Sequence, residues 1–197
     1  MDTEIEAKFL NINHAGFRQA LVKAGAELVA KERLMCREVF DFPDERLEKI
    51  GGWVRVRNEG DKITMSYKQL NDRTINGTKE VTLVVDNYEN AKQFLLSIGL
   101  ITKSYQETKR ESWRLDGVEI ELDTWPWIPT FVEFEAPSEK LLKNVVAKLG
   151  LSWQNAKHGS VETAYQDVYD VSEQEIDSWE SITFIPVPDW LVARKRQ

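Results

Sequence analysis

Apolar and charged side chains alternate along most of this chain, so its strands must each present one apolar and one charged face. In segment 53–57, Arg55 and Arg57 share one face, while the valines beside them share the other. The same alternation runs through segments 3–10, 62–69, 79–85, 118–125 and 130–136. Because a period of two residues does not suit a helix, most of the chain is expected to form a sheet.

Eight strands are predicted in all, since extended segments at 26–42 and 103–115 add to those above. Helical patterns separate them, at 13–24, 88–98 and 138–149, with weaker ones at 160–168 and 173–180. The proline-containing stretch 185–190 is expected to be an extended arm lying on the domain. A chain of 197 residues without a Gly/Ser linker is therefore expected to form one α+β domain dominated by an antiparallel sheet.

The charged faces repeat like charges two residues apart, as in Glu133 and Glu135. One interpretation is an ordinary outer face in contact with solvent. Repeated carboxylate pairs repel each other, however, and therefore favour a bound counter-ion. The amphipathic helices are also numerous enough to cover an apolar face from outside. The second interpretation is thus an eight-stranded antiparallel barrel, a tunnel with a charged lumen and helices packed on its outside.

Composition excludes several classes of protein. The net charge is −7, from 26 Lys and Arg against 33 Asp and Glu, which argues against a nucleic-acid surface. No stretch approaches the roughly 20 apolar residues of a membrane helix, and the first residues do not read as a signal peptide. One cysteine and two histidines argue against a disulfide and a structural zinc site. We expect a cytoplasmic protein, monomer or homodimer, with a small-molecule partner and neither nucleic acid nor membrane.

A lumen lined by carboxylates together with Lys and Arg suits a polyphosphate bound with a divalent metal. Mg²⁺ or Mn²⁺ prefers oxygen ligands, normally one or two carboxylates together with phosphate oxygens and water. Guanidinium and ammonium groups neutralise the remaining phosphate charge. Carboxylates alone would repel the phosphates, and basic groups alone would not place the metal.

The charged faces carry recognisable motifs in a fixed order: Glu4-Ile-Glu6-Ala-Lys8, Val39-Phe40-Asp41, Arg55-Val-Arg57, Tyr67-Lys68, Lys79-Glu80-Val81, Lys109-Arg110-Glu-Ser-Trp113, Glu121-Leu-Asp123, Phe131-Val-Glu133-Phe-Glu135 and, later, Ala164-Tyr165-Gln-Asp-Val. With these elements the sequence resembles the CYTH superfamily, the triphosphate tunnel metalloenzymes, over about residues 2–168. That group includes class IV adenylyl cyclases, thiamine triphosphatases and inorganic triphosphatases. One departure is that the family spaces a Lys and an Arg as K-x-R, whereas here Lys109 and Arg110 are adjacent.

The resemblance implies a role for each matching residue and a division of the chain. It implies a tunnel domain over 1–170, with 171–197 as a C-terminal helix and extended arm packed on it. Residues implied as metal ligands for Mg²⁺ or Mn²⁺ are Glu4, Glu6, Asp123, Glu133 and Glu135. Residues implied to bind the substrate are Lys8, Arg55, Arg57, Lys68, Lys109 and Arg110. Residues implied to act in catalysis are Glu6, Lys68, Glu80 and Glu135.

Three functions remain open at this level. The first is metal-dependent hydrolysis of inorganic, nucleoside or other organic triphosphate. The second is the conversion of ATP to cyclic AMP and pyrophosphate, as in a class IV adenylyl cyclase. The third is polyphosphate binding without catalysis, which the abundance of carboxylates disfavours. No P-loop, G-x-G-x-x-G or G-x-S-x-G motif points to another chemistry.

Overall fold

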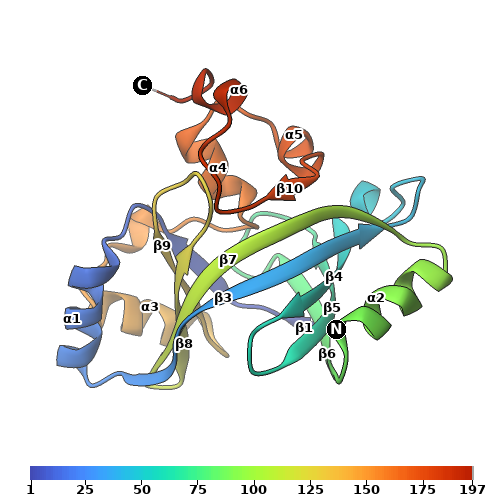
Figure 1. Ribbon diagram of the computed structural model, residues 1–197. Helices are drawn as coiled ribbons and strands as arrows, with labels where there is room; N and C mark the ends of the chain where they lie inside the picture. The colour runs from blue at the N-terminus through green and yellow to red at the C-terminus, as the bar shows by residue number, and fades with distance from the viewer. Residues whose placement is uncertain (197) are drawn as a thin grey trace.

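The computed structural model describes residues 1–196 and contains one curled sheet (Figure 1). Its strands are β1 (Asp2–Thr3), β2 (Glu6–Phe9), β3 (Glu27–Asp41), β4 (Gly52–Asn58), β5 (Ile63–Leu70), β6 (Thr78–Val85), β7 (Ile101–Leu115), β8 (Val118–Thr124), β9 (Phe131–Glu135) and β10 (Ser181–Ile182). Its α-helices are α1 (His14–Ala24), α2 (Tyr88–Ser97), α3 (Glu139–Lys148), α4 (Glu162–Val168), α5 (Glu173–Asp177) and α6 (Asp189–Val192). Short 3₁₀ turns lie at Glu48–Ile50 and Trp153–Asn155.

The N-terminal segment joins the two ends of the sheet. The strand order is β1-β6-β5-β4-β3-β7-β8-β9-β2, so β1 and β2 pair with opposite ends. Thr3 pairs with Lys79 of β6, while Glu6 pairs with Glu135 of β9, all antiparallel. The predicted antiparallel, barrel-like sheet is therefore confirmed. The predicted strand 3–10 is divided into β1 and β2. A further short strand, β10, pairs with β7 in parallel.

The apolar faces of the strands point outward and are covered by helices, as the alternation predicts. Figure 1 shows α1 and α3 on one flank of the sheet and α2 on the other. Beneath α1 and α3, Phe9, Ile120 and Phe134 are buried in one core. Beneath α2, Phe40 and Val56 form a second core with Leu95 of the helix. The charged faces are consequently left on the concave side.

The C-terminal residues build a third core with the loop between β8 and β9. Trp125 and Phe131 pack there with Tyr165 of α4, Ile182 of β10 and Leu191 of α6. The stretch 185–190 was expected to be extended throughout, but α6 begins at Asp189 within it. Figure 1 shows α4, α5 and α6 grouped together at one side of the sheet. None of the helices within residues 1–196 is long and apolar enough to cross a membrane.

Two local features explain why the strands turn where they do. Asp116 and Gly117 both have positive φ, 52° and 82°, which is the geometry of a tight hairpin turn between β7 and β8. The long pair β3 and β7 contains register shifts, including one between Val39 and Phe40. Such bulges bend a strand and increase its twist, which helps the sheet to curl around its charged face.

Candidate functional site

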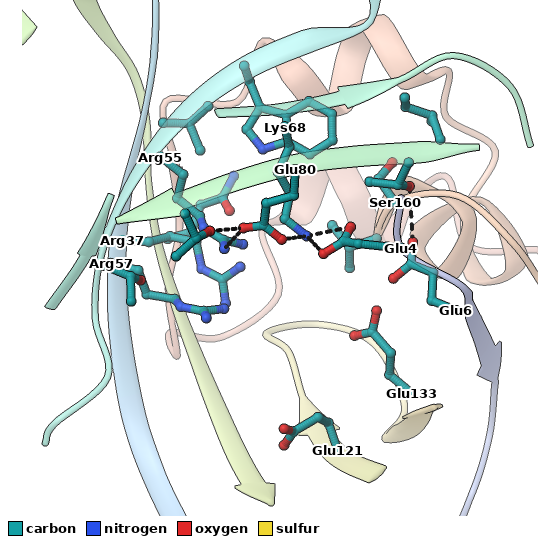
Figure 2. Close-up of a pocket in the computed structure, with 18 of the residues that line it drawn as sticks. Glu4, Glu6, Arg37, Arg55, Arg57, Lys68, Glu80, Glu121, Glu133 and Ser160 are labelled. Carbon is teal, nitrogen blue, oxygen red and sulfur yellow. Dashed lines mark hydrogen bonds and ion pairs between the residues drawn. The ribbon is translucent and has the colours of Figure 1, made fainter. Parts of the chain in front are cut away.

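The concave side of the sheet encloses a cavity of about 1100 Å³ (Figure 2). It is lined by the charged faces that the sequence places opposite the apolar ones. The predicted site residues on its wall are Glu4, Glu6, Lys8, Arg55, Arg57, Lys68, Glu80, Arg110, Glu133 and Glu135. These residues come from strands as distant in the chain as β2 and β9, so the site exists only once the sheet has closed.

One side of the cavity is rich in carboxylates, and each of two lysines there lies within ion-pair distance of two of them. Lys8 Nζ lies 2.9 Å from Glu133 Oε1 and 3.3 Å from Glu6 Oε2. Lys68 Nζ lies 2.8 Å from Glu4 Oε1 and 2.9 Å from Glu80 Oε2 (Figure 2). Glu135 is different, because no Lys or Arg of the described chain lies within 4.0 Å of its carboxylate.

The carboxylates resist ionisation where they are buried beside one another. Burial raises the pKa of Glu4 to about 8, and its hydrogen bond with Glu80 adds to the rise. Burial also raises the pKa of Glu6 to about 7, with the Glu133 carboxylate adding to it against the Lys8 ammonium. The pKa of Glu135 is raised as well, by burial and by Glu133. A bound cation on this side of the cavity would therefore favour the ionised carboxylates, because it would offset the burial and the mutual repulsion that raise their pKa values.

The opposite side of the cavity is rich in arginine. Arg57 donates from Nε and Nη2 to Glu59 Oε1, at 3.0 and 2.6 Å. Arg55 lies 3.6 Å from Glu80, and its Nε is buried without a hydrogen-bond partner. Burial lowers the pKa of Arg55 to about 9, and the charge of Arg57 lowers it further. The Arg55 guanidinium is thus incompletely neutralised by the protein itself, whereas Arg57 is paired with Glu59.

Asp123 is buried against Arg110 and does not line the cavity. Arg110 donates from Nε and Nη2 to the two oxygens of Asp123, both at 2.7 Å. The same guanidinium reaches Glu133 Oε2 at 3.0 Å. Asp123 therefore orients Arg110 in this structure, whereas the sequence predicts it as a metal ligand.

Lys109 is separated from the other predicted site residues. Adjacent residues of a strand point to opposite faces, so Arg110 faces the cavity and Lys109 faces away. Lys109 Nζ lies 5.1 Å from the ring centre of Phe184, on the outer side. The structure gives no contact between Lys109 and the cavity.

Arg37 and Glu59 are among the charged residues of the cavity wall that are absent from the sequence prediction. Arg37 of β3 is buried, and its sequence neighbour Glu38 is charged too, which hides the alternation there. Glu38 points to the outer side, where it binds Lys92 at 2.7 Å. Glu59 follows Arg55 and Arg57 at the same spacing of two, so extending that pattern past residue 57 would have found it.

The donor set fits a hard divalent cation. All acidic groups of the cavity offer oxygen ligands, and a buried Glu121 oxygen has no hydrogen-bond partner. Among the residues that the structure describes, no three acidic, His or Cys side chains are arranged to hold a metal by themselves. That does not conflict with Mg²⁺ or Mn²⁺, because such ions commonly take one or two carboxylates and complete their shell with phosphate and water.

Comparisons with known proteins agree with this geometry. The family model described as CYTH domain matches residues 2–163. A candidate adenylate cyclase from Vibrio parahaemolyticus has a similar fold, with a TM-score of 0.72 and 16% identity over 84% of this chain and 98% of that chain. The PH1012 protein from Pyrococcus horikoshii OT3 gives a TM-score of 0.67 and 21% identity, over 82% and 98%.

A third similar structure comes from a plant. The candidate adenylyl cyclase HpAC1 from Hippeastrum, whose dominant activity is that of a triphosphatase, gives a TM-score of 0.58 and 14% identity, over 88% of this chain and 94% of that one. No curated protein matches the chain in sequence. At these identities the structural matches show a shared fold.

Proposed function

Because the chain belongs to the CYTH domain family, we propose that it is a divalent-metal-dependent enzyme that binds a triphosphate group in its tunnel and hydrolyses it. The observation that carries this proposal is the division of charge within one cavity. The incompletely neutralised guanidinium group of Arg55 lies on one side, and carboxylates that resist ionisation line the other. An anion together with a cation satisfies both sides at once, as a metal-bound polyphosphate does.

The basic residues would bind and orient the phosphate chain. Arg55 and Arg57 project from the same face of one strand, with backbones about 7 Å apart by strand rise, so their guanidinium groups can bind different oxygens of one phosphate chain. Arg110, fixed by Asp123, would add a planar pair of donors, while Lys8 and Lys68 would contribute point charges. Glu80 holds Lys68 at 2.9 Å and Arg55 at 3.6 Å, so it positions the basic residues.

The carboxylates of the other side would hold the metal. Glu4, Glu6, Glu133 and Glu135 supply the oxygen ligands, and a bound Mg²⁺ or Mn²⁺ would neutralise phosphate oxygens during the reaction. Glu135, which lines the cavity and has no ion pair among the described residues, would also accept the proton of the attacking water. In that reaction the water oxygen bonds to the terminal phosphorus as the bond to its bridging oxygen breaks.

Cyclisation of ATP is the second candidate. The cavity, at about 1100 Å³, is larger than a triphosphate alone needs, so it can also admit a nucleoside. The Vibrio protein of similar fold is described as a candidate adenylate cyclase. Hydrolysis is preferred because it requires only the phosphate cradle, and because a candidate cyclase of this fold, HpAC1, is dominantly a triphosphatase.

One experiment distinguishes these functions. The protein is incubated with inorganic triphosphate and, separately, with ATP, each with Mg²⁺ or Mn²⁺, and every product is identified by phosphorus NMR and chromatography. Hydrolysis gives inorganic phosphate with pyrophosphate or ADP. Cyclisation gives cyclic AMP with pyrophosphate. Binding of both compounds without any product would leave the chain as a polyphosphate-binding protein and overturn the proposal.

A further inference from the structure

Arg37 is a buried cation without a carboxylate partner. Its side chain lies on the cavity wall, with only 6% of the residue exposed. The cationic groups of the predicted site that line the cavity, Lys8, Arg55, Arg57, Lys68 and Arg110, each have an acidic group within 4.0 Å. No Asp or Glu of residues 1–196 lies that close to Arg37. Such a charge is costly unless something outside the chain compensates it.

The guanidinium of Arg37 is held in place, and one of its donors has no partner among residues 1–196. Nη2 donates to Thr108 Oγ1 at 2.7 Å, and the group stacks over the Trp125 ring at 4.7 Å from its centre. Nε is buried and has no hydrogen-bond partner. Burial, and then the charges of Arg55 and Arg57, hold the pKa of Arg37 well below its ordinary value. The group is thus fixed and lacks an anion.

We propose that Arg37 binds a phosphate group of the triphosphate, at the arginine side of the cavity beside Arg55 and Arg57. Figure 2 shows these three side chains together on the same side, facing the carboxylates. This inference rests on the proposed function, since it assigns one more residue to the same substrate. A phosphate oxygen would accept a hydrogen bond from the guanidinium and would neutralise the uncompensated charge.

The C-terminal residues support Arg37 through a chain of aromatic rings. Trp125, on which Arg37 stacks, packs edge-on against Tyr165 at 6.4 Å between ring centres. Tyr165 packs against Trp179 at 5.3 Å, and Trp179 packs against Trp190 at the same distance. Trp179 and Trp190 lie beyond residue 163, where the family match ends. The C-terminal part of this chain therefore fixes the wall on which the phosphate-binding guanidinium rests.

Calorimetric titration with inorganic triphosphate in EDTA, at 0.15 M salt, tests the assignment without turnover. Arg37→Gln is expected to weaken binding by about tenfold or more, because a charge-assisted hydrogen bond is lost. Arg37→Lys should recover part of the affinity, since it keeps the charge but not the planar group. The matched control is Arg33→Gln, on the same strand and cavity wall. Arg33 donates to Glu59 O, Arg110 O and Ser112 Oγ, so its Nε and Nη1 donors are already used within the protein.

The melting temperature without ligand separates a binding role from a structural one. If Arg37 serves a ligand, Arg37→Gln should melt at the same temperature as the wild type or higher, because an uncompensated buried charge is removed. Arg33→Gln should melt lower and lose less than about threefold in affinity, because distant charges are screened at this salt. Equal affinity of wild type and Arg37→Gln, or equal losses in both variants, would overturn the assignment while the proposed function stands. A wild type that neither binds nor hydrolyses triphosphate would overturn both.

Discussion

Glu6 of β2 and Glu135 of β9 are directly paired across the seam that closes the sheet. Like charges opposite each other on neighbouring strands destabilise a sheet. Here the pair lies beside the Glu6–Lys8–Glu133 cluster, in which one ammonium contacts two carboxylates. The closing seam is therefore short of positive charge, and a divalent cation is the ligand that would correct the deficit.

Metal and triphosphate should stabilise the protein together more than separately. Each alone leaves one side of the cavity uncompensated, whereas both together satisfy the arginines and the carboxylates. A ligand at about 100 times its dissociation constant adds roughly 2.7 kcal/mol to the free energy of unfolding. Thermal melts with Mg²⁺ or Mn²⁺, with inorganic triphosphate, and with both would measure this. Strictly additive shifts would count against a shared site.

Removing the charge of a seam carboxylate should abolish activity while the fold persists. Glu6→Gln and Glu135→Gln keep side-chain volume and delete a ligand charge, so both should lose triphosphate turnover in steady-state assays. Glu139→Gln is the matched control, since Glu139 is exposed and pairs only with Lys143 on α3. Circular dichroism would verify that all three fold. Undiminished turnover in the seam variants would exclude these carboxylates from the site.

Asp123→Asn should affect substrate binding rather than metal binding. Both Asp123 oxygens are occupied by Arg110, so the substitution frees that guanidinium from its orientation. We expect a higher KM for triphosphate and a lower melting temperature, with an unchanged affinity for Mn²⁺. Titration of Mn²⁺ by electron paramagnetic resonance would check the last point. A large loss of Mn²⁺ affinity would restore Asp123 as a metal ligand.

Arg57→Ala should weaken triphosphate use by about tenfold or more, in line with the loss of a charge-assisted bond of roughly 1.5–3 kcal/mol. Arg57→Lys should recover only part of the loss, because an ammonium lacks the planar fork of donors. Steady-state kinetics on inorganic triphosphate would measure both variants. If wild type and variants had the same kcat/KM, Arg57 would serve only to pair with Glu59.

The metal-free protein should become less stable as the pH rises from 5 to about 8.5. Glu4 and Glu6 have folded-state pKa values of about 8 and about 7, above their ordinary value of 4.5. A group with a raised pKa stabilises the fold below its unfolded value and loses that contribution as the pH passes through the folded value. Glu80 and Glu133 have lowered pKa values, so both are ionised across this window and contribute no slope.

Chemical denaturation in EDTA at several pH values would follow this trend. Saturating Mg²⁺ or Mn²⁺ should flatten it, because a cation replaces the protons on these carboxylates. A metal-free stability that rose with pH over the same window would contradict the raised pKa values. The Glu4→Gln variant should lose part of the slope, since its amide cannot titrate.

The alternation of side chains predicts the sheet and which side chains share a face, but it leaves open whether the charged face meets solvent or lines a cavity. Val54 and Arg55 illustrate the prediction, because a strand can bury both only on opposite sides of a sheet. Closure by a divided first strand was not predictable, since nothing local marks Glu4 and Ile5 as the point where β1 ends before β2 begins. That division follows from two partners at opposite ends of the sheet.

Within the site, sequence reasoning placed residues on a face but could not assign their partners. Asp123 and Glu133 look alike by spacing, yet one is covered by Arg110 and the other is shared by Arg110 and Lys8. Arg37 was missed because an adjacent charged residue, Glu38, serves the outer side. Such distinctions depend on which side chains meet across strands far apart in the chain.

The divided first strand also sets the order of events during biosynthesis. Residues 2–9 leave the ribosome before residues 132–135, which are the partners of β2. At about 5–20 residues per second, this strand waits roughly 6 to 25 seconds for them. With β9 still missing, the nascent chain lacks Glu133 and Glu135, two of the four proposed metal ligands. The protein should therefore be unable to capture metal or triphosphate until most of it has been made.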